Sequence, residues 1–373
     1  MKLADLGDAL TATPALRALH STWPAASIDV LTSPAGAEAL AGLTSIDRLI
    51  AVEKHRFDSP ASVLSPSALT AVWPTLRELR ARHYDYLLLM HHLTTRFGAA
   101  KYRALVRVIG AQITVGLDNG RGGFLDLPVE DRGFGLLHEA DYASALVERM
   151  GAHVAPRQLE IAIDGLARRE AARLLGSDRW LALHVGGGIF SLARRWDPAG
   201  FAAAANEIAR RTCARVVLLG TSVDRQATDA TLAQLSVPAL DLVDRLSAKL
   251  TAAVLERCAL LLSNDSGVVH LGAAVGTPVV AVFGPTNDLA WGPYPPEKHA
   301  VVRVTLPCSP CAYRGTGLGT PQGCPTRDCL QLVTPRMVVQ AAERLLARQP
   351  APGSLREAAP RQGMALEPRP NMP

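Results

Sequence analysis

Apolar and polar positions along this chain change their period several times, and the clearest pattern lies in its last third. Residues 259–263 (ALLLS) and 279–283 (VVAVF) are apolar runs of strand length. Neither run alternates with polar residues, so both are expected to be buried on two faces, as the strands of a parallel sheet are. Between them, residues 268–275 suit a short helix that Gly276 and Pro278 would end. This stretch predicts a strand, a loop, a helix and a second strand.

Short apolar runs and helical segments alternate along the rest of the chain as well. Such alternation is typical of an α/β protein with parallel sheets. The further strands are predicted at 27–31, 49–52, 84–90, 114–116, 180–185 and 216–219, and the helices at 35–41, 73–83, 138–150, 166–175, 198–211 and 336–348.

Three stretches divide this pattern. Residues 54–66 are polar and contain proline, which predicts a loop, and residues 157–165 are the expected linker between two domains, 1–156 and 157–348. From Gln349 the chain is rich in proline, so 349–373 is predicted to be a disordered tail.

Composition and charge exclude several classes of protein. Hydrophobic residues make up 48% of the chain, which is enough for sizeable cores. There is no uncharged apolar run of 18 residues to span a membrane, and the first ten residues contain two aspartates, unlike a signal peptide. We therefore expect a cytoplasmic protein. The net charge of +5 suits phosphate-bearing ligands or an anionic membrane face, but no dense basic run predicts a nucleic-acid partner.

Candidate ligand-binding residues follow the predicted strand at 259–263. Asp265, Ser266 and Gly267 would lie at the carboxyl end of a strand and the amino end of a helix. Open α/β sheets bind ligands at that edge, and free backbone N–H groups at a helix start attract anions. His270 lies one helical turn beyond Ser266 on the same face. The alternatives are that Asp265 and Ser266 only cap the helix and that His270 is structural.

Other polar residues follow the remaining predicted strands of the second half. Gly187 lies in a run of three glycines, which lets a backbone approach a phosphate but also suits a plain loop. Arg194 and Arg195 come shortly after it. Asp224 follows a predicted strand, where an acidic residue can hold a nucleotide ribose or can cap a helix.

Four cysteines lie within 22 residues near the end of the second half, and the group opens with Cys-x2-Cys. They are Cys308, Cys311, Cys324 and Cys329. This spacing is typical of a tetrahedral thiolate site, so we predict a structural zinc or iron, with free thiols as the alternative. The segment contains few large apolar residues, and a metal would help to order it.

Two of these stretches resemble motifs of a known family. The sequence NDSGVVHLGAAVGTPVVAVFGPT, at 264–286, resembles the donor-site motif of glycosyltransferase family 9, the heptosyltransferases of lipopolysaccharide core synthesis. LADLGDALTATP, at 3–14, resembles the first motif of that family, a Gly-Asp loop followed by a helix, which Thr13 would cap. The resemblance runs from Leu3 to about Leu346. It implies a GT-B fold, in which an acceptor-side and a donor-side Rossmann-like domain face each other across a cleft.

The resemblance also implies roles for single residues. Asp8 stands at the place of the general base, which removes the proton of an attacking sugar hydroxyl; a helix cap is the alternative. Arg194 stands where the family has a lysine that contacts the donor phosphates, and arginine keeps the charge. Arg194, Arg195 and the amides around Ser266 and Gly267 would stabilise the departing diphosphate without a catalytic metal.

The beginning of the chain departs from the family pattern. Family members have an apolar strand before the first motif, whereas here only Met1 and Lys2 precede Leu3. We expect either that the true start lies upstream or that the sheet lacks its central strand.

The resemblance thus implies an inverting glycosyltransferase. It would move a heptose or related sugar from ADP-heptose, or another nucleotide sugar, to a lipopolysaccharide core acceptor at the cytoplasmic face of the inner membrane. The polar run from His91 to Arg96, after a predicted strand, is the expected acceptor side. The rival interpretations are a GT-B sugar-nucleotide epimerase and a non-catalytic nucleotide-sugar-binding protein.

Overall fold

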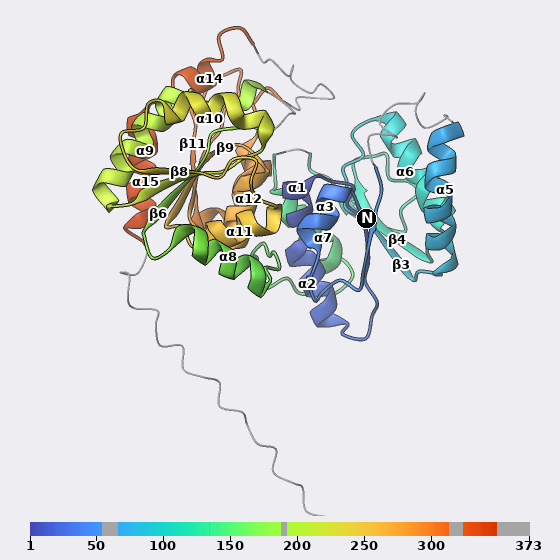
Figure 1. Ribbon diagram of the computed structural model, residues 1–373. Helices are drawn as coiled ribbons and strands as arrows, with labels where there is room; N and C mark the ends of the chain where they lie inside the picture. Colours follow the sequence, from blue (N-terminus) through green and yellow to red (C-terminus); the bar gives the residue numbers. More distant parts are fainter. Residues whose placement is uncertain (54–65, 134, 188–191, 313–323, 349–373) are drawn as a thin grey trace, which may run out of the picture.

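The structure is a computed structural model that describes residues 1–53, 66–133, 135–187, 192–312 and 324–348. The chain is α/β, as predicted, and its strands form parallel sheets in two lobes, one from each half of the chain (Figure 1). The predicted tail at 349–373 and nearly all of the predicted loop at 54–66 lie outside the described residues. No helix in the described ranges is both long and apolar enough to cross a bilayer.

The second lobe contains a parallel sheet of six strands in the order β11-β10-β9-β6-β7-β8. The chain runs from β6 outward to β8, returns to β9 beside β6, and then runs outward to β11. The direction of winding therefore changes between β6 and β9. The strands are β6 (Trp180–His184), β7 (Arg215–Leu218), β8 (Ala239–Asp241), β9 (Leu260–Asn264), β10 (Val279–Val282) and β11 (Ala300–Val302).

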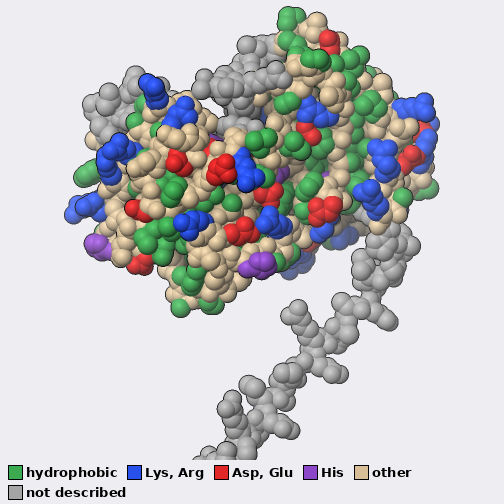
Figure 2. Space-filling model, turned by 180° about the vertical axis from the view of Figure 1, so that it is seen from behind, with side chains coloured by type: hydrophobic (Ala, Val, Ile, Leu, Met, Phe, Trp, Pro, Cys, Tyr) green, Lys and Arg blue, Asp and Glu red, His purple; other side chains and the backbone are tan. Residues whose placement is uncertain are grey.

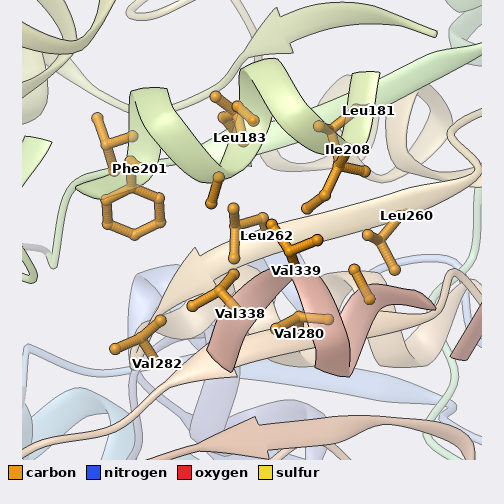
Figure 3. Packing of buried hydrophobic residues seen from close by; sticks show 14 of the residues in the cluster. Leu181, Leu183, Phe201, Ile208, Leu260, Leu262, Val280, Val282, Val338 and Val339 are labelled. Atoms are coloured by element: carbon orange, nitrogen blue, oxygen red, sulfur yellow. The ribbon is translucent and has the colours of Figure 1, made fainter. Parts of the chain in front are cut away.

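Alternate residues of these strands fill two apolar layers. Leu181 and Leu260 face one layer, with Phe201 of α9 and Val338 of α15 (Figure 3). Ala182 and its counterparts on the other strands face the opposite layer. Because both faces are covered, the strands are apolar throughout, as the sequence indicated. The covering helices are α9 (Pro198–Thr212), α10 (Arg225–Leu232) and α15 (Pro335–Leu346) on the first face, and α8 (Gly165–Leu175), α11 (Ala248–Glu256) and α12 (Gly267–Ala274) on the second.

The first lobe contains two smaller parallel sheets. One pairs β1 (Asp29–Thr32) with β2 (Arg48–Ala51), and the other has the order β3 (Tyr86–Leu89), β4 (Ile113–Asp118) and β5 (Leu127–Glu130). The helices of this lobe are α1 (Leu6–Leu10), α2 (Thr13–Thr22), α3 (Pro34–Leu40), α5 (Pro66–Ala81), α6 (Arg96–Ile109) and α7 (Glu139–Glu148).

Residues 1–3 run between β1 and β3 and link the two small sheets. The amide of Lys2 donates to the carbonyl of Leu31 at 3.0 Å, and the amide of Met90 donates to the carbonyl of Met1 at 3.0 Å. Lys2 also forms a parallel bridge with Thr32. The place for which the sequence suggested a missing strand thus contains a three-residue segment, and α1 begins shortly after it, at Leu6.

A cavity of about 1130 Å³ lies beside this segment, lined by Trp23, Asp29, Tyr86 and others. Asp29 and Tyr86 are the first residues of β1 and β3, so the cavity opens at the amino ends of the strands. Ligands of parallel sheets bind at the carboxyl ends, and this cavity is therefore not the expected ligand site.

Several predicted element bounds were wrong. The Gly7-Asp8 stretch is not a loop but part of α1, and Thr13 does not cap α2, because Ala12 is its N-cap and the Thr13 hydroxyl donates to the carbonyl of Leu10. The helix predicted from residue 73 begins at Pro66 and continues through Pro74. Elements that were not predicted are α6, α10, α11, β5, β8 and β11, together with the short helices α13 (Asp288–Trp291), α14 (Asp328–Gln331), η2 (Leu192–Arg194), η3 (Ser222–Asp224) and η4 (Pro296–Lys298).

Candidate functional site

The candidate site lies at the carboxyl ends of β6 and β9, where the winding of the second sheet changes direction. Open α/β sheets bind ligands at such switch points. Gly186 and Gly187 follow β6, and Asp265 and Ser266 follow β9. Asn264, the last residue of β9, holds the two strand ends together, because its amide donates to the carbonyls of Val185 and Gly186 at 2.9 and 2.8 Å.

Arg194 joins the two strand ends from the side. Its guanidinium donates to the carbonyl of Gly187 at 3.0 Å and lies 3.4 Å from a carboxylate oxygen of Asp265. The same oxygen of Asp265 accepts a hydrogen bond from the hydroxyl of Thr286 at 2.6 Å. The structure therefore brings three of the predicted donor-site residues together and orients their charged groups.

Ser266 is the N-cap residue of α12, but its hydroxyl makes no capping hydrogen bond. Instead it lies 3.1 Å from Nδ1 of His184, the last residue of β6. The capping role that was the alternative for Ser266 is therefore not what its side chain does. The amides at the start of α12 remain without a side-chain cap from this residue, which leaves a helix start suited to an anion.

Asp224 is buried within a network of hydrogen bonds. It accepts from the Thr221 amide at 3.0 Å, which forms a capping box at η3, and it lies 3.3 Å from Arg195 and 3.6 Å from Nε2 of His184. Burial alone would raise the pKa of Asp224, but the contacts with His184 and Thr221 outweigh it and hold this pKa well below its usual range. Asp224 thus has the capping contacts of the alternative interpretation, and Arg195 is oriented toward it.

Gly186, two residues after β6, lies at a position that has no room for a side chain. A Cβ atom added to this residue would lie 1.8 Å from a carboxylate oxygen of Asp224. The backbone therefore passes over the buried carboxylate at a distance that only glycine allows.

The predicted base lies on α1, which packs against α12 of the other lobe. A Cβ added to Gly7 would lie 2.8 Å from Cα of Gly267 and 2.8 Å from Cδ2 of His270. Asp8, the next residue, is partly exposed. The structure thus brings the residue after Gly7, a carboxylate of the first lobe, close to the helix start that follows β9.

His270 is buried in this contact between the lobes. Its ring meets that of His138, at the start of α7, edge to face with a centroid distance of 6.4 Å. Burial lowers the pKa of His270 to about 3, so the ring is neutral near pH 7. A neutral ring in this place favours the alternative structural role, although the contact with α1 keeps it next to the candidate site.

The expected acceptor side after β3 is occupied by contacts within the protein. Nε2 of His91 accepts a hydrogen bond from the Leu3 amide at 2.7 Å. His92 lies 2.9 Å from both Asp131 and Glu139, and Lys2 lies 3.4 Å from Glu139. His91 and His92 therefore hold the segment at 1–3 and the start of α7, and the acceptor side at 91–96 stays a prediction.

The four cysteines do not form a recognisable metal site. Within the described part of the chain, no three His, Cys, Asp or Glu side chains are grouped so that they could hold a metal ion. Cys308, Cys311 and Cys324 are exposed, whereas Cys329 is buried. Burial, followed by the charges of the other three thiols, raises the pKa of Cys329.

Sequence reasoning missed two residues of the site, His184 and Thr286. Both are buried, and both contact predicted residues across the sheet. The signal for His184 was a polar residue at the end of an otherwise apolar strand. Thr286 is the last residue of the motif at 264–286, and no pattern in the sequence indicated that its side chain would contact the site.

Comparison with known proteins finds a family model and several relatives that are similar to this chain. The family model described as "Glycosyltransferase family 9 (heptosyltransferase)" matches residues 72–320. Lipopolysaccharide heptosyltransferase 1 of Pseudomonas aeruginosa is 26% identical over 83% of this chain and 84% of its own length. Lipooligosaccharide heptosyltransferase 2 of Campylobacter jejuni is 26% identical over 43% of this chain, and the chain matches only 49% of that relative.

Solved structures show that the fold is GT-B, as predicted. A family 9 glycosyltransferase from Veillonella parvula superposes with a TM-score of 0.71 at 24% identity, covering 93% of this chain and 96% of that one. A heptosyltransferase of Escherichia coli solved with ADP gives a TM-score of 0.67 at 18% identity, covering 92% of this chain and 100% of that one.

Proposed function

Because this chain belongs to glycosyltransferase family 9, the heptosyltransferase family, we propose that it transfers a heptose from ADP-heptose to a lipopolysaccharide core acceptor with inversion. The observation that supports this most strongly is the close approach of α1 and α12. It brings the carboxylate-bearing helix of the first lobe to the helix start where the donor diphosphate would bind. A base and a leaving-group site on opposite lobes are what a displacement at an anomeric carbon needs.

The proposed step is a displacement at the anomeric carbon of the donor sugar. An acceptor hydroxyl oxygen forms a bond to the anomeric carbon as the bond from that carbon to the diphosphate oxygen breaks. The hydroxyl proton passes to the carboxylate of Asp8, and ADP leaves with the electron pair of the broken bond. Arg194 and the amides at the start of α12, near Ser266 and Gly267, stabilise the growing negative charge on the diphosphate.

An assay of ADP release tests this function against its rivals. We expect ADP to be released from ADP-heptose only when a lipopolysaccharide core acceptor is present. Conversion of the sugar nucleotide without any acceptor would instead identify an epimerase. Binding of ADP-heptose with no turnover under either condition would identify a non-catalytic binding protein.

A structural metal on the four cysteines stays part of this proposal. Its support is the sequence, in which four cysteines lie within 22 residues and the group opens with Cys-x2-Cys. We expect about one equivalent of zinc or iron in protein purified without chelators, lost in a Cys308→Ser/Cys311→Ser double variant. Wild-type protein with four titratable thiols and no metal would refute the site.

A further inference from the structure

The outer face of α6 carries a stripe of arginines. Arg96, Arg103 and Arg107 are exposed, and their spacings of seven and four residues place them on one side of the helix. Ala99, Val106 and Ile109, on the side of the helix next to this stripe, are buried against the first lobe. The orientation of α6 is therefore fixed by its apolar face, and the arginines point outward.

These arginines have no acidic partner nearby in the described part of the chain. The sequence contains no Asp or Glu between Asp85 and Asp118. Among the described residues, none of the three guanidinium groups lies within ion-pair distance of a carboxylate, whereas other exposed arginines such as Arg168 and Arg173 are paired. Like charges on one helix face repel each other, so this face is suited to an external anionic surface.

Helix α5 extends the same face with an exposed tryptophan. Arg80 donates to the backbone carbonyls of Arg107 and Val108 at 3.5 and 3.0 Å, so its side of α5 lies against α6. Trp73 lies seven residues before Arg80 and is therefore on the same side, and it is 61% exposed. Arg77, between them, is also exposed. Figure 2, seen from behind, shows Lys and Arg side chains along the outer edge of this lobe, at the left of the view.

We propose that this α5–α6 face, made by Trp73, Arg77, Arg96, Arg103 and Arg107, docks on the surface of an anionic phospholipid bilayer. Arginines attract anionic headgroups, and tryptophan prefers the boundary between headgroups and acyl chains. The outward-facing stripe on a helix suits a flat surface, whereas single-stranded nucleic acid needs a groove with several stacking aromatic rings. The inference deepens the proposed function and rests on it in one respect, because a lipid-anchored acceptor would be presented at such a surface.

Vesicle cosedimentation of the full chain tests this proposal. We expect binding to vesicles that contain phosphatidylglycerol, little binding to pure phosphatidylcholine, and loss of binding at high salt. Arg103→Gln/Arg107→Gln should weaken binding by about 25-fold, since each arginine near an anionic surface contributes roughly a fivefold factor. Trp73→Ser should weaken it as well.

The matched control is Arg169→Gln/Arg179→Gln, which removes the same charge from exposed positions in the other half of the chain. It should bind vesicles like the wild type, and circular dichroism should show that both double variants are folded. Equal vesicle binding by the two variants, no binding by the wild type, or a preference for a single-stranded oligonucleotide over the vesicles would overturn the proposal. Transfer to a delipidated acceptor should be intact in the Arg103/Arg107 variant, so failure of docking and failure of the proposed activity are distinguishable.

Discussion

At the scale of single residues, Arg194 is the cation of the site with the clearest geometry. It bridges the Gly187 carbonyl and the Asp265 carboxylate at the switch point of the sheet. Arg195, by contrast, is directed to Asp224 and to the carbonyl of Val223. Of the two arginines predicted from the sequence, Arg194 is therefore the one that we expect to meet the donor diphosphate.

We predict that Arg194→Ala weakens ADP binding by about 10- to 100-fold, since a hydrogen bond to a charged group contributes about 1.5–3 kcal/mol. Arg194→Lys should lose less, because it keeps the positive charge. Calorimetric titration of both variants with ADP measures the effect. The same ADP affinity in wild type and alanine variant would remove Arg194 from the site.

His92 is a buried residue of the first lobe whose ionisation affects the stability of the fold. Burial alone would lower its pKa, but hydrogen bonds with Asp131 and Glu139 outweigh burial and raise the pKa to about 9. A raised pKa in the folded state contributes stability that is fully present below the unfolded value of 6.5 and is lost as the pH rises through about 9. The pKa values of Asp131 and Glu139 are lowered, so their contribution is lost as the pH falls below about 4.

We predict that His92→Ala lowers the free energy of unfolding by about 3 kcal/mol near pH 6, since it removes the charged hydrogen-bond partner that two buried carboxylates share. The difference from wild type should shrink above pH 9. Urea denaturation at several pH values measures it, with the exposed His153→Ala as the control. A difference that stays constant from pH 6 to pH 10 would contradict the assignment of a charged His92.

At the scale of elements, the contact of α1 with α12 sets the position of Asp8. Gly7 and Gly267 lie 260 positions apart in the sequence, and their close approach depends on the absence of a side chain at Gly7. A methyl group there would meet backbone and a buried ring, neither of which can rotate away. The two helices would have to separate.

We predict that Gly7→Ala lowers the transfer rate by about 100-fold, because a misplacement of about 1 Å at a reacting group has that effect. Gly123→Ala is the matched control, since a Cβ at Gly123 would meet nothing within 4 Å. Steady-state kinetics of both variants test the claim. A wild-type rate in Gly7→Ala would show that this contact does not position the base.

Local patterns in the sequence predicted a large part of the elements but not all of them. The apolar run at 259–263 became β9 at Leu260–Asn264, because buried parallel strands leave a pattern that needs no knowledge of their neighbours. Helix α6 was missed although Ala99, Val106 and Ile109 have helical spacing. Strands β8 and β11 are only three residues long, too short for any period to show.

At the scale of the whole molecule, the sequence could name residues of the site but not their contacts. Asp265 and Arg194 were identified from strand ends and from the family resemblance, and the structure brings them together. The partnership of Ser266 with His184 depends on which strands are neighbours in the sheet. The contact of Gly7 with His270 depends on how the two lobes pack, which no local pattern records.

The central claim is that Asp8, held against the donor-binding helix, removes the proton of the acceptor hydroxyl. Mass spectrometry of the acceptor after incubation with ADP-heptose tests it most directly, with wild type and Asp8→Asn compared at equal occupancy by ADP-heptose. We predict one added heptosyl unit with the wild type and a rate lower by about 10²–10⁴ with Asp8→Asn, as for the loss of a general base, while ADP affinity stays within a few-fold. The same rate of heptosyl addition by Asp8→Asn and by the wild type would contradict the account.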